Sequence, residues 1–337
     1  MNSSDLDAFF RGKRVLITGG LGFIGSNLAR DLVRAGSAVL LVDSLVPEYG
    51  GNLANIHGVD DAVNVNVSDV RDEYSFRFLI QGHDILFNLA GQTSHLDSMM
   101  NPYTDLEINC RSQLSILEAC RHHNPTVTVV FASTRQIYGR PQYLPVDELH
   151  PIAPVDINGI HKAAGERYHL LYSEIHGINV SILRLTNTYG PHMRVKDDRQ
   201  TFLGSWIKAI VRGEPLTIFG DGSQRRDFTY VDDAVRALML AAASAEAQGE
   251  VFNLGGERSI SLRELAELLI EANDGGEYRM VAFPGERRAI DIGDYYADFS
   301  KISDGLGWRP EVTLEDGLAR SIDFYREHGA SYWGSDV

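Results

Sequence analysis

The sequence predicts an α/β fold in which a doubly wound parallel sheet carries a smaller, interleaved α/β lobe. Three observations predict it: an apolar run that breaks into spaced glycines at residues 15–25, an alternation of strand and helix patterns up to about residue 186, and shorter elements beyond that point. Alternating strands and helices form a parallel sheet with helices on both faces. We therefore expect ligands to bind beyond the carboxyl ends of the strands.

The glycines follow the first apolar run in a Gly-x-x-Gly-x-x-Gly spacing. Gly19 allows a sharp turn, Gly22 lets backbone amides approach a pyrophosphate, and Gly25 lets the following helix pack closely on the strand. The N-terminus of that helix then faces the phosphates. Such a spacing can also mark nothing more than a turn. In this context it predicts a dinucleotide-binding Rossmann unit.

A second apolar strand, residues 38–42, ends in Asp43, about twenty residues beyond the glycines, where dinucleotide-binding folds place an acid. A carboxylate at this position accepts hydrogen bonds from the ribose hydroxyls and repels a 2′-phosphate. The spacing therefore favours NAD over NADP. The alternative is a solvated acid at the end of a strand.

Three further strands reach the same edge of the predicted sheet. Residues 62–67 alternate apolar and polar side chains, residues 84–91 form a buried strand that ends in small residues, and residues 126–132 carry Ser133 and Thr134 to the edge. The small residues leave room for a cofactor. On these segments and on the glycine-rich turn, the residues predicted to contact the cofactor are Phe23, Ile24, Asp69, Val70, Leu89 and Ala90.

The remaining patterns define the predicted domains. Helices are expected at 72–81, 99–122, 157–176, 201–212, 232–246, 261–273 and 314–328, and strands at 180–185, 216–219, 228–230 and 251–254. We assign residues 1–186 to the dinucleotide-binding domain and residues 187–337 mainly to a substrate-binding lobe. Segments at about 228–256 could belong to either.

Composition limits the partners. The 337-residue chain has a formal net charge of −15, which argues against a nucleic-acid surface and favours small-molecule ligands. No apolar run is long enough to span a membrane, and the first ten residues lack the pattern of a signal peptide. Cys110 and Cys120 lie about 15 Å apart along one predicted helix and cannot pair with each other. We expect a cytoplasmic protein without a metal site.

Several motifs, in order along the chain, resemble the extended short-chain dehydrogenase/reductases, and most closely the nucleotide-sugar epimerases, dehydratases and decarboxylases. The motifs are residues 18–25, 69–72, Ser94-His95 with Asn101-Pro102 and Asn109, 187–191, and 220–228 with 230–233. The resemblance covers roughly residues 12–325. It implies NAD as cofactor, with Asn109 among its contacts, and a nucleotide-diphosphate sugar as substrate. It also implies a homodimer formed through the helices near 99–122 and 157–176.

In that family a sugar hydroxyl, usually at C4, is oxidised to a transient ketone before the hydride returns. The resemblance implies that Ser133, Thr134 and Lys162 belong to the catalytic apparatus. The family's tyrosine, four residues before the lysine, is Asn158 here, and an amide cannot act as a base near neutral pH. Three explanations stay open: an engineered substitution, an enzyme with another acid/base such as His161, or a binding protein that no longer turns over.

The residues after Thr134 bear on the type of reaction. Related dehydratases place an Asp-Glu pair there and related decarboxylases a glutamate, whereas this chain has Arg135 and Gln136. Neither side chain supplies an acid for loss of water, so epimerisation is favoured, with dehydration or decarboxylation as alternatives. The resemblance places the substrate diphosphate at Asn187, Arg226 and one of the two arginines at 287 and 288, of which we choose Arg288. A dehydrogenase that releases NADH is a further alternative.

Overall fold

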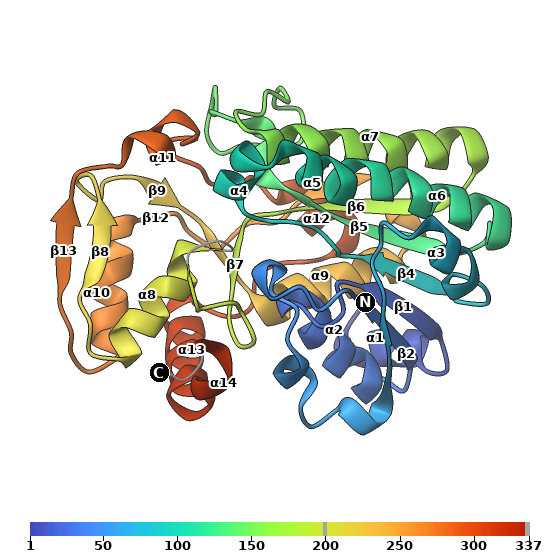
Figure 1. The fold of residues 1–337 in the computed structure, drawn as a ribbon, viewed down its shortest axis with the longest axis horizontal. Helices are drawn as coiled ribbons and strands as arrows, with labels where there is room; N and C mark the ends of the chain where they lie inside the picture. The colour runs from blue at the N-terminus through green and yellow to red at the C-terminus, as the bar shows by residue number, and fades with distance from the viewer. Residues whose placement is uncertain (198–200, 334–337) are drawn as a thin grey trace.

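The computed structural model describes residues 1–197 and 201–333. In this part of the chain the largest sheet has seven strands, all parallel, in the order β11-β6-β5-β4-β1-β2-β3 (Figure 1). The strands are β1 (Arg14–Thr18), β2 (Ala38–Asp43), β3 (Val63–Val67), β4 (Ile85–Asn88), β5 (Thr128–Thr134), β6 (Asn179–Leu185) and β11 (Val251–Asn253). The order changes direction at β1, between β2 and β4, where doubly wound sheets open a ligand crevice. The predicted fold class is confirmed.

Helices cover both faces of the sheet because central strands such as β1 and β4 are buried on both sides. On one face lie α1 (Ser3–Phe10), α2 (Phe23–Arg34) and α9 (Val231–Ala243), and on the other α3 (Glu73–Leu79), α6 (Ser112–His123) and α7 (Ile157–His176) (Figure 1). Val15 and Ile17 pack into the core with α2 and α9, whereas Leu16 packs into the core with α3, α6 and α7. This is the alternation expected of a strand that is buried on both faces.

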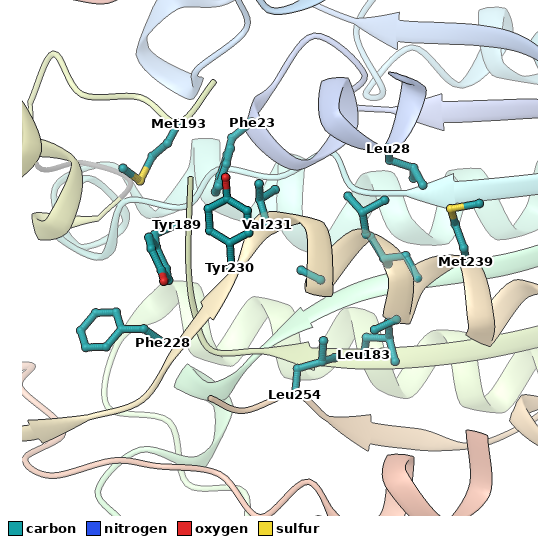
Figure 2. Close-up of a cluster of buried hydrophobic side chains, with 14 of the residues drawn as sticks. Phe23, Leu28, Leu183, Tyr189, Met193, Phe228, Tyr230, Val231, Met239 and Leu254 are labelled. Atoms are coloured by element: carbon teal, nitrogen blue, oxygen red, sulfur yellow. The ribbon is translucent and has the colours of Figure 1, made fainter. Parts of the chain in front are cut away.

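The first of these cores continues into the later part of the chain. Figure 2 shows Leu28 of α2 and Met239 of α9 above Leu183 of β6, and beside them Tyr189, Phe228 and Tyr230 from the lobe. The two regions are therefore joined by one continuous apolar core.

The prediction of one long helix at 99–122 is wrong at the N-terminal end of that range. The structure has α4 (His95–Met100), α5 (Pro102–Leu106), a π-helical turn at Glu107–Arg111, and then α6. Asn101 ends α4 and caps α5, its side chain accepting a hydrogen bond from the backbone N–H of Thr104 at 3.3 Å. Pro102 occupies the first position of α5, where a missing N–H costs nothing. The Asn-Pro pair thus divides what periodicity alone presents as one helix.

The later residues build a lobe of short elements. It contains α8 (Phe202–Val211), α10 (Leu262–Ala272), α11 (Gly285–Ala289), α12 (Ser300–Leu306), α13 (Leu314–His328), α14 (Ala330–Trp333), β7 (Asn187–Tyr189), β8 (Leu216–Phe219), β9 (Arg225–Arg226), β10 (Phe228–Tyr230), β12 (Ile260–Ser261) and β13 (Tyr278–Val281). In the described residues these strands pair two by two, as β7 with β10, β8 with β13 and β9 with β12. The strand β11 returns to the large sheet beside β6. The C-terminal helix predicted at 314–328 is followed by α14, and the predicted lobe also includes residues 198–200 and 334–337, which lie outside the described residues.

The sequence predicts no membrane-spanning segment and no disulfide between Cys110 and Cys120. None of the helices in the described ranges is long and apolar enough to cross a membrane. Cys110 and Cys120 are both free thiols, and burial raises the pKa of Cys120 to about 12.

Candidate active site

The turn between β1 and α2 is built so that only glycine fits. Gly19 has a φ of +68°, and a Cβ there would lie 3.0 Å from the backbone of Ala90 at the end of β4. A Cβ on Gly25 would lie closer than 3.0 Å to the carbonyl oxygen of Gly19, a separation that real Cβ contacts essentially never show. Gly22, which has no side chain, stands at the N-cap of α2. The N–H groups of the first turn of α2 therefore face an open, anion-binding cradle.

Asp43 ends β2 beside this turn. Its carboxylate accepts hydrogen bonds from the backbone N–H of Leu21 at 3.0 Å and from that of Leu45 at 2.9 Å. Burial raises the pKa of Asp43, against the effect of these two bonds. The bonds hold the carboxylate in place, and a carboxylate has lone pairs left for two ribose hydroxyls.

A cleft runs along the carboxyl ends of the strands and collects most of the predicted residues. Those that line it are Gly19, Gly22, Phe23, Ile24, Gly25, Asp43, Asp69, Val70, Leu89, Ala90, Ser133, Thr134, Asn158, Lys162 and Asn187. It is also lined by Tyr49, Gln92 and His95, to which sequence reasoning assigned no role. Tyr49 ends a three-residue 3₁₀ helix and Gln92 lies in an irregular segment, and both segments are too short to show periodicity. His95 was visible only as part of a motif.

Asn109 and Asn158 share a buried network behind the cleft. The Nδ2 of Asn109 donates to the carbonyl of Gln92 at 2.9 Å and to Oδ2 of Asp105 at 3.0 Å. The Nδ2 of Asn158 donates to the same two oxygens at 2.8 and 3.1 Å. Because the Asn158 amide nitrogen points inward, its Oδ1 is the polar atom of that side chain left to face the cleft. The Oδ1 of Asn109 is buried and has no hydrogen-bond partner among the described residues.

His161 belongs to the far side of this network. Its Nδ1 lies 2.7 Å from Oδ1 of Asp105, and its side chain is mostly buried. His161 is not among the described residues that line this cleft or the cavity that adjoins it. The structure therefore does not bring His161 to the place where a substitute base would act.

Lys162 lies one helical turn after Asn158 on α7. Its Nζ donates to the carbonyl of Ala132 at 2.6 Å and sits 4.4 Å from the centre of the Phe131 ring. Burial lowers the pKa of Lys162 to about 8, while the charges of Asp105 and Glu166 act in the opposite direction. A buried ammonium with one backbone acceptor retains donors for a further ligand.

The two hydroxyls at the end of β5 have different partners. Ser133 Oγ donates to Glu166 Oε2 at 2.8 Å, and Glu166 forms a buried ion pair with Arg184. Thr134 Oγ1 accepts from the backbone N–H of Gln136 at 3.3 Å. Ser133 is thereby anchored to the core, and both residues line the cleft.

Two polar atoms border the backbone of Gly91 beside the cleft. A Cβ on Gly91 would lie 2.9 Å from the unpartnered Oδ1 of Asn109 and 3.8 Å from Nζ of Lys162, so both polar atoms border the same stretch of backbone. The glycine turn borders the adjacent residue, because a Cβ on Gly19 would lie 3.0 Å from the backbone of Ala90. The residues present fit an extended, phosphate-containing cofactor.

A second cavity of about 920 Å³ opens between the sheet edge and the lobe, within the usual size range of small-molecule sites. It shares His95, Arg135, Asn187 and Thr201 with the first cleft. We call the region lined by these four residues the seam. The two cavities thus meet at the end of the cleft that carries Asn158 and Lys162.

Arginines of the lobe line this second cavity. Arg226 is buried, lies 3.4 Å from Asp291 and donates to the carbonyls of Arg225 and Gly293. Burial lowers its pKa to about 10, and the nearby charge of Arg135 acts in the same direction. Arg287 lines the cavity, whereas among the described lining residues Arg288 does not occur, and its guanidinium lies 6.0 Å from the Phe283 ring centre.

The loop after β5 is fixed by its own side chains. Arg135 Nη2 donates to Asn187 Oδ1 at 2.8 Å, and Gln136 Nε2 donates to Asp156 Oδ2 at 2.7 Å. Asn187 Nδ2 in turn donates to the carbonyl of Asp227 at 2.9 Å. The guanidinium of Arg135 lies 5.4 Å from the centre of the Tyr295 ring. This loop presents the Arg135 cation to the seam and the Gln136 amide to the second cavity, and neither is an acid.

A profile of the NAD dependent epimerase/dehydratase family matches residues 15–255. The chain belongs to this family. It is 32% identical to a putative UDP-glucose 4-epimerase of Methanocaldococcus jannaschii, over 93% of this chain and 99% of the relative. It is 31% identical to a dTDP-glucose 4,6-dehydratase of Streptomyces niveus, over 95% of this chain and 94% of the relative.

A solved structure extends the comparison. The dTDP-glucose 4,6-dehydratase of Streptomyces venezuelae, solved with NAD bound, superposes with a TM-score of 0.86 at 28% identity, covering 95% of this chain and 98% of that one. Relatives at about this identity include epimerases, dehydratases and a decarboxylase, so membership of the NAD-dependent epimerase/dehydratase family defines the cofactor and the general chemistry but not the reaction. The family resemblance and the prediction of NAD are confirmed.

Proposed function

We propose that this member of the NAD-dependent epimerase/dehydratase family epimerises a nucleotide-diphosphate sugar through a transient 4-keto intermediate. The observation that carries the proposal is the seam, where residues at the Asn158 and Lys162 end of the first cleft adjoin a cavity lined by Arg226 and Arg287. A sugar at the seam would place its diphosphate in that second cavity, because arginines bind phosphate through charge-assisted hydrogen bonds.

The loop after β5 supports epimerisation over dehydration or decarboxylation. Arg135 and Gln136 stand where the related dehydratases and decarboxylases carry acids, and both are engaged, with Asn187 and Asp156 respectively. Epimerisation requires only removal of a hydride and a proton, rotation of the ketone and their return. NAD, when bound, supplies the hydride acceptor and donor for this cycle.

The chain's own residues take distinct roles in the proposal. Lys162 holds the nicotinamide ribose, Thr134 and the Oδ1 of Asn158 orient the sugar hydroxyl, and Ser133 keeps the strand end in place through Glu166. Asn187 and Arg226 hold the diphosphate, and Arg287 takes the place that we had given to Arg288. Asp43 holds the adenosine ribose.

Asn158 favours a second candidate, a protein that binds NAD and a nucleotide sugar without turnover. One experiment separates the two. The purified protein is incubated in D₂O with a panel of UDP-, dTDP-, CDP- and GDP-sugars, and the products are analysed by NMR. An epimerase yields a C4 epimer without deuterium at C4, because the hydride that leaves is the one that returns.

Other outcomes assign other functions. A 4-keto-6-deoxy product indicates a dehydratase, release of CO₂ from a uronic acid substrate indicates a decarboxylase, and binding without any product indicates the non-catalytic protein. A stoichiometric release of NADH would indicate an ordinary dehydrogenase. Each of these results contradicts epimerisation.

We also propose the homodimer implied by the family. Leu114 of α6 and Leu171 and Ile175 of α7 are exposed apolar side chains on the two helices concerned. Sedimentation equilibrium should give twice the chain mass, and replacing Leu171 by Glu should shift the protein toward the monomer. A wild-type monomer would contradict this proposal.

A further inference from the structure

The first turn of α7 meets the first turn of α4 at the seam. Ser98 Oγ accepts a hydrogen bond from the backbone N–H of Asn158 at 3.2 Å. His95, three residues earlier on the same face of α4, contacts Asp156, the N-cap residue of α7. His95 therefore sits beside the same helix end as the position of the missing tyrosine, and it lines both cavities.

The His95 ring turns its Nδ1 toward Asp156. Nδ1 of His95 lies 2.9 Å from Oδ2 of Asp156, at ion-pair distance but without the alignment of a hydrogen bond among the described residues, and is itself buried, while 37% of the His95 side chain is exposed. The exposed edge of the ring is therefore the one that carries Nε2. His95 presents that edge to the seam.

Asp156 is equipped to hold the imidazole in one tautomer. Its fully buried carboxylate accepts from the backbone N–H of Gly159 at 2.7 Å and from Gln136 Nε2 at 2.7 Å. Burial alone would raise the pKa of Asp156, but these contacts and His95 together hold it below its usual value. A charged carboxylate beside Nδ1 stabilises the proton on Nδ1 and leaves the lone pair on Nε2.

From this geometry we propose, on the basis of the proposed function, that His95 is the general base and acid of the reaction and that Asp156 positions it. His95 Nε2 takes the proton of the sugar hydroxyl as the same carbon loses its hydride to the nicotinamide cofactor, forming the C=O bond of the ketone. When the hydride returns to the other face of the ketone, Nε2–H gives the proton back to the oxygen. The step leaves enzyme and cofactor unchanged overall.

The neighbouring groups do not serve in its place. Asn158 Oδ1 can accept a hydrogen bond from the hydroxyl but cannot hold the proton at neutral pH. Arg135 stays protonated, and the Asp105–His161 pair lies behind the Asn158 amide. Lys162 donates to the carbonyl of Ala132 from inside the core. Among the described residues that line both cavities, His95 is the one with an imidazole side chain.

The first test compares two histidine variants. A nucleotide sugar that reduces the bound cofactor of the wild-type protein is mixed rapidly with each variant, and the reduced-nicotinamide absorbance is followed. His95→Gln should lower the single-turnover rate by about 10²–10⁴-fold, the usual contribution of a general base. His122→Gln is the matched control, because His122 is an exposed histidine at the end of α6, and it should change nothing.

Two further variants separate loss of chemistry from loss of fold. His95→Ala should regain activity when imidazole is added to the solution. Asn158→Tyr, combined with His95→Gln, should restore at least about a tenth of the wild-type rate, because it supplies the family's own base. A His95→Gln protein that binds the sugar and reduces its cofactor within about threefold of the wild-type rate overturns the proposal.

A measurement without turnover tests the role of Asp156. In ¹⁵N-histidine NMR spectra of the protein, the signal lost in His95→Gln should show an Nδ1–H tautomer whose Nε2 shifts on addition of UDP. Asp156→Asn keeps a capping oxygen on α7 but should abolish that tautomer preference and lower the rate at least about tenfold. An unchanged tautomer and rate in Asp156→Asn would overturn the positioning role.

Failure of this inference and of the proposed function can be told apart. A wild-type protein that reduces its cofactor with none of the sugars overturns both. A wild-type epimerase that is insensitive to His95→Gln overturns only the role of His95.

Discussion

Two helix N-termini face the cleft, that of α2 after the glycine-rich turn and that of α7 at Asn158, and they are built in opposite ways. At α2 the contacts come from backbone atoms, and Gly19 and Gly25 leave no room for any side chain. At α7 the contacts come from side chains, and Asn158 donates hydrogen bonds to Gln92 and Asp105. A site made from backbone tolerates almost no substitution, whereas one made from side chains can exchange its reactive group and keep its fold.

The largest effect should come from adding a methyl group at the α2 turn. Gly25→Ala places a Cβ against the carbonyl oxygen of Gly19, and overpacking of this kind costs up to about 3 kcal/mol. Affinity for NAD should fall about 10²-fold, measured by calorimetry. Gly285→Ala is the control, because a Cβ there meets nothing within 4 Å. Unchanged affinity in Gly25→Ala would contradict a backbone-built site.

The next largest effect is expected in the second cavity, where Arg226 is a lining side chain. Arg226→Ala should weaken binding of a nucleoside diphosphate by about 1.5–3 kcal/mol, the range for a hydrogen bond to a charged group, and leave NAD binding unchanged. Arg258→Ala, at an exposed arginine paired with Glu315, is the control. If calorimetry shows that Arg226→Ala weakens NAD instead, Arg226 does not belong to the substrate cavity.

Asp43 combines the two kinds of contact, because it binds through its side chain and that side chain accepts hydrogen bonds from backbone N–H groups. The wild-type protein should bind NAD much more tightly than NADP, and Asp43→Asn should narrow that ratio about tenfold, since removing the charge removes about 1.4 kcal/mol of repulsion. Asparagine is preferred to alanine because it still accepts a hydrogen bond from Leu21 or Leu45. Equal affinities for NAD and NADP in the wild-type protein would refute the role of Asp43.

The smallest effect is expected for Asn158→Tyr, which introduces on α7 the tyrosine that the family resemblance implies. With His95 acting as the base, Asn158→Tyr alone should change the rate of cofactor reduction by less than about tenfold. The measurement is the same absorbance after rapid mixing, with Lys162→Ala as a control that weakens NAD binding. A gain of about 10²-fold, typical of a newly supplied base, would mean that the wild-type protein has none.

The sequence by itself determined the features that depend on short stretches of chain. These features are the glycine turn, Asp43 at the end of β2 and the alternation of strands and helices. They can be predicted locally because turn chemistry and periodicity act over a few residues. Helix α7 was predicted at 157–176 and spans Ile157–His176. The family motifs then supplied NAD, and they underlie the proposal of a nucleotide-sugar substrate.

Only the tertiary structure decided which distant residues meet. The two- and three-residue strands β7, β9 and β12 carry no periodicity, and β11 joins the sheet because β6 offers it an edge. His161 lies beside Lys162 in the sequence yet turns toward Asp105, whereas His95, sixty-three positions before Asn158, reaches the seam. Side-chain direction depends on what packs against an element from elsewhere in the chain, and local sequence does not contain that information.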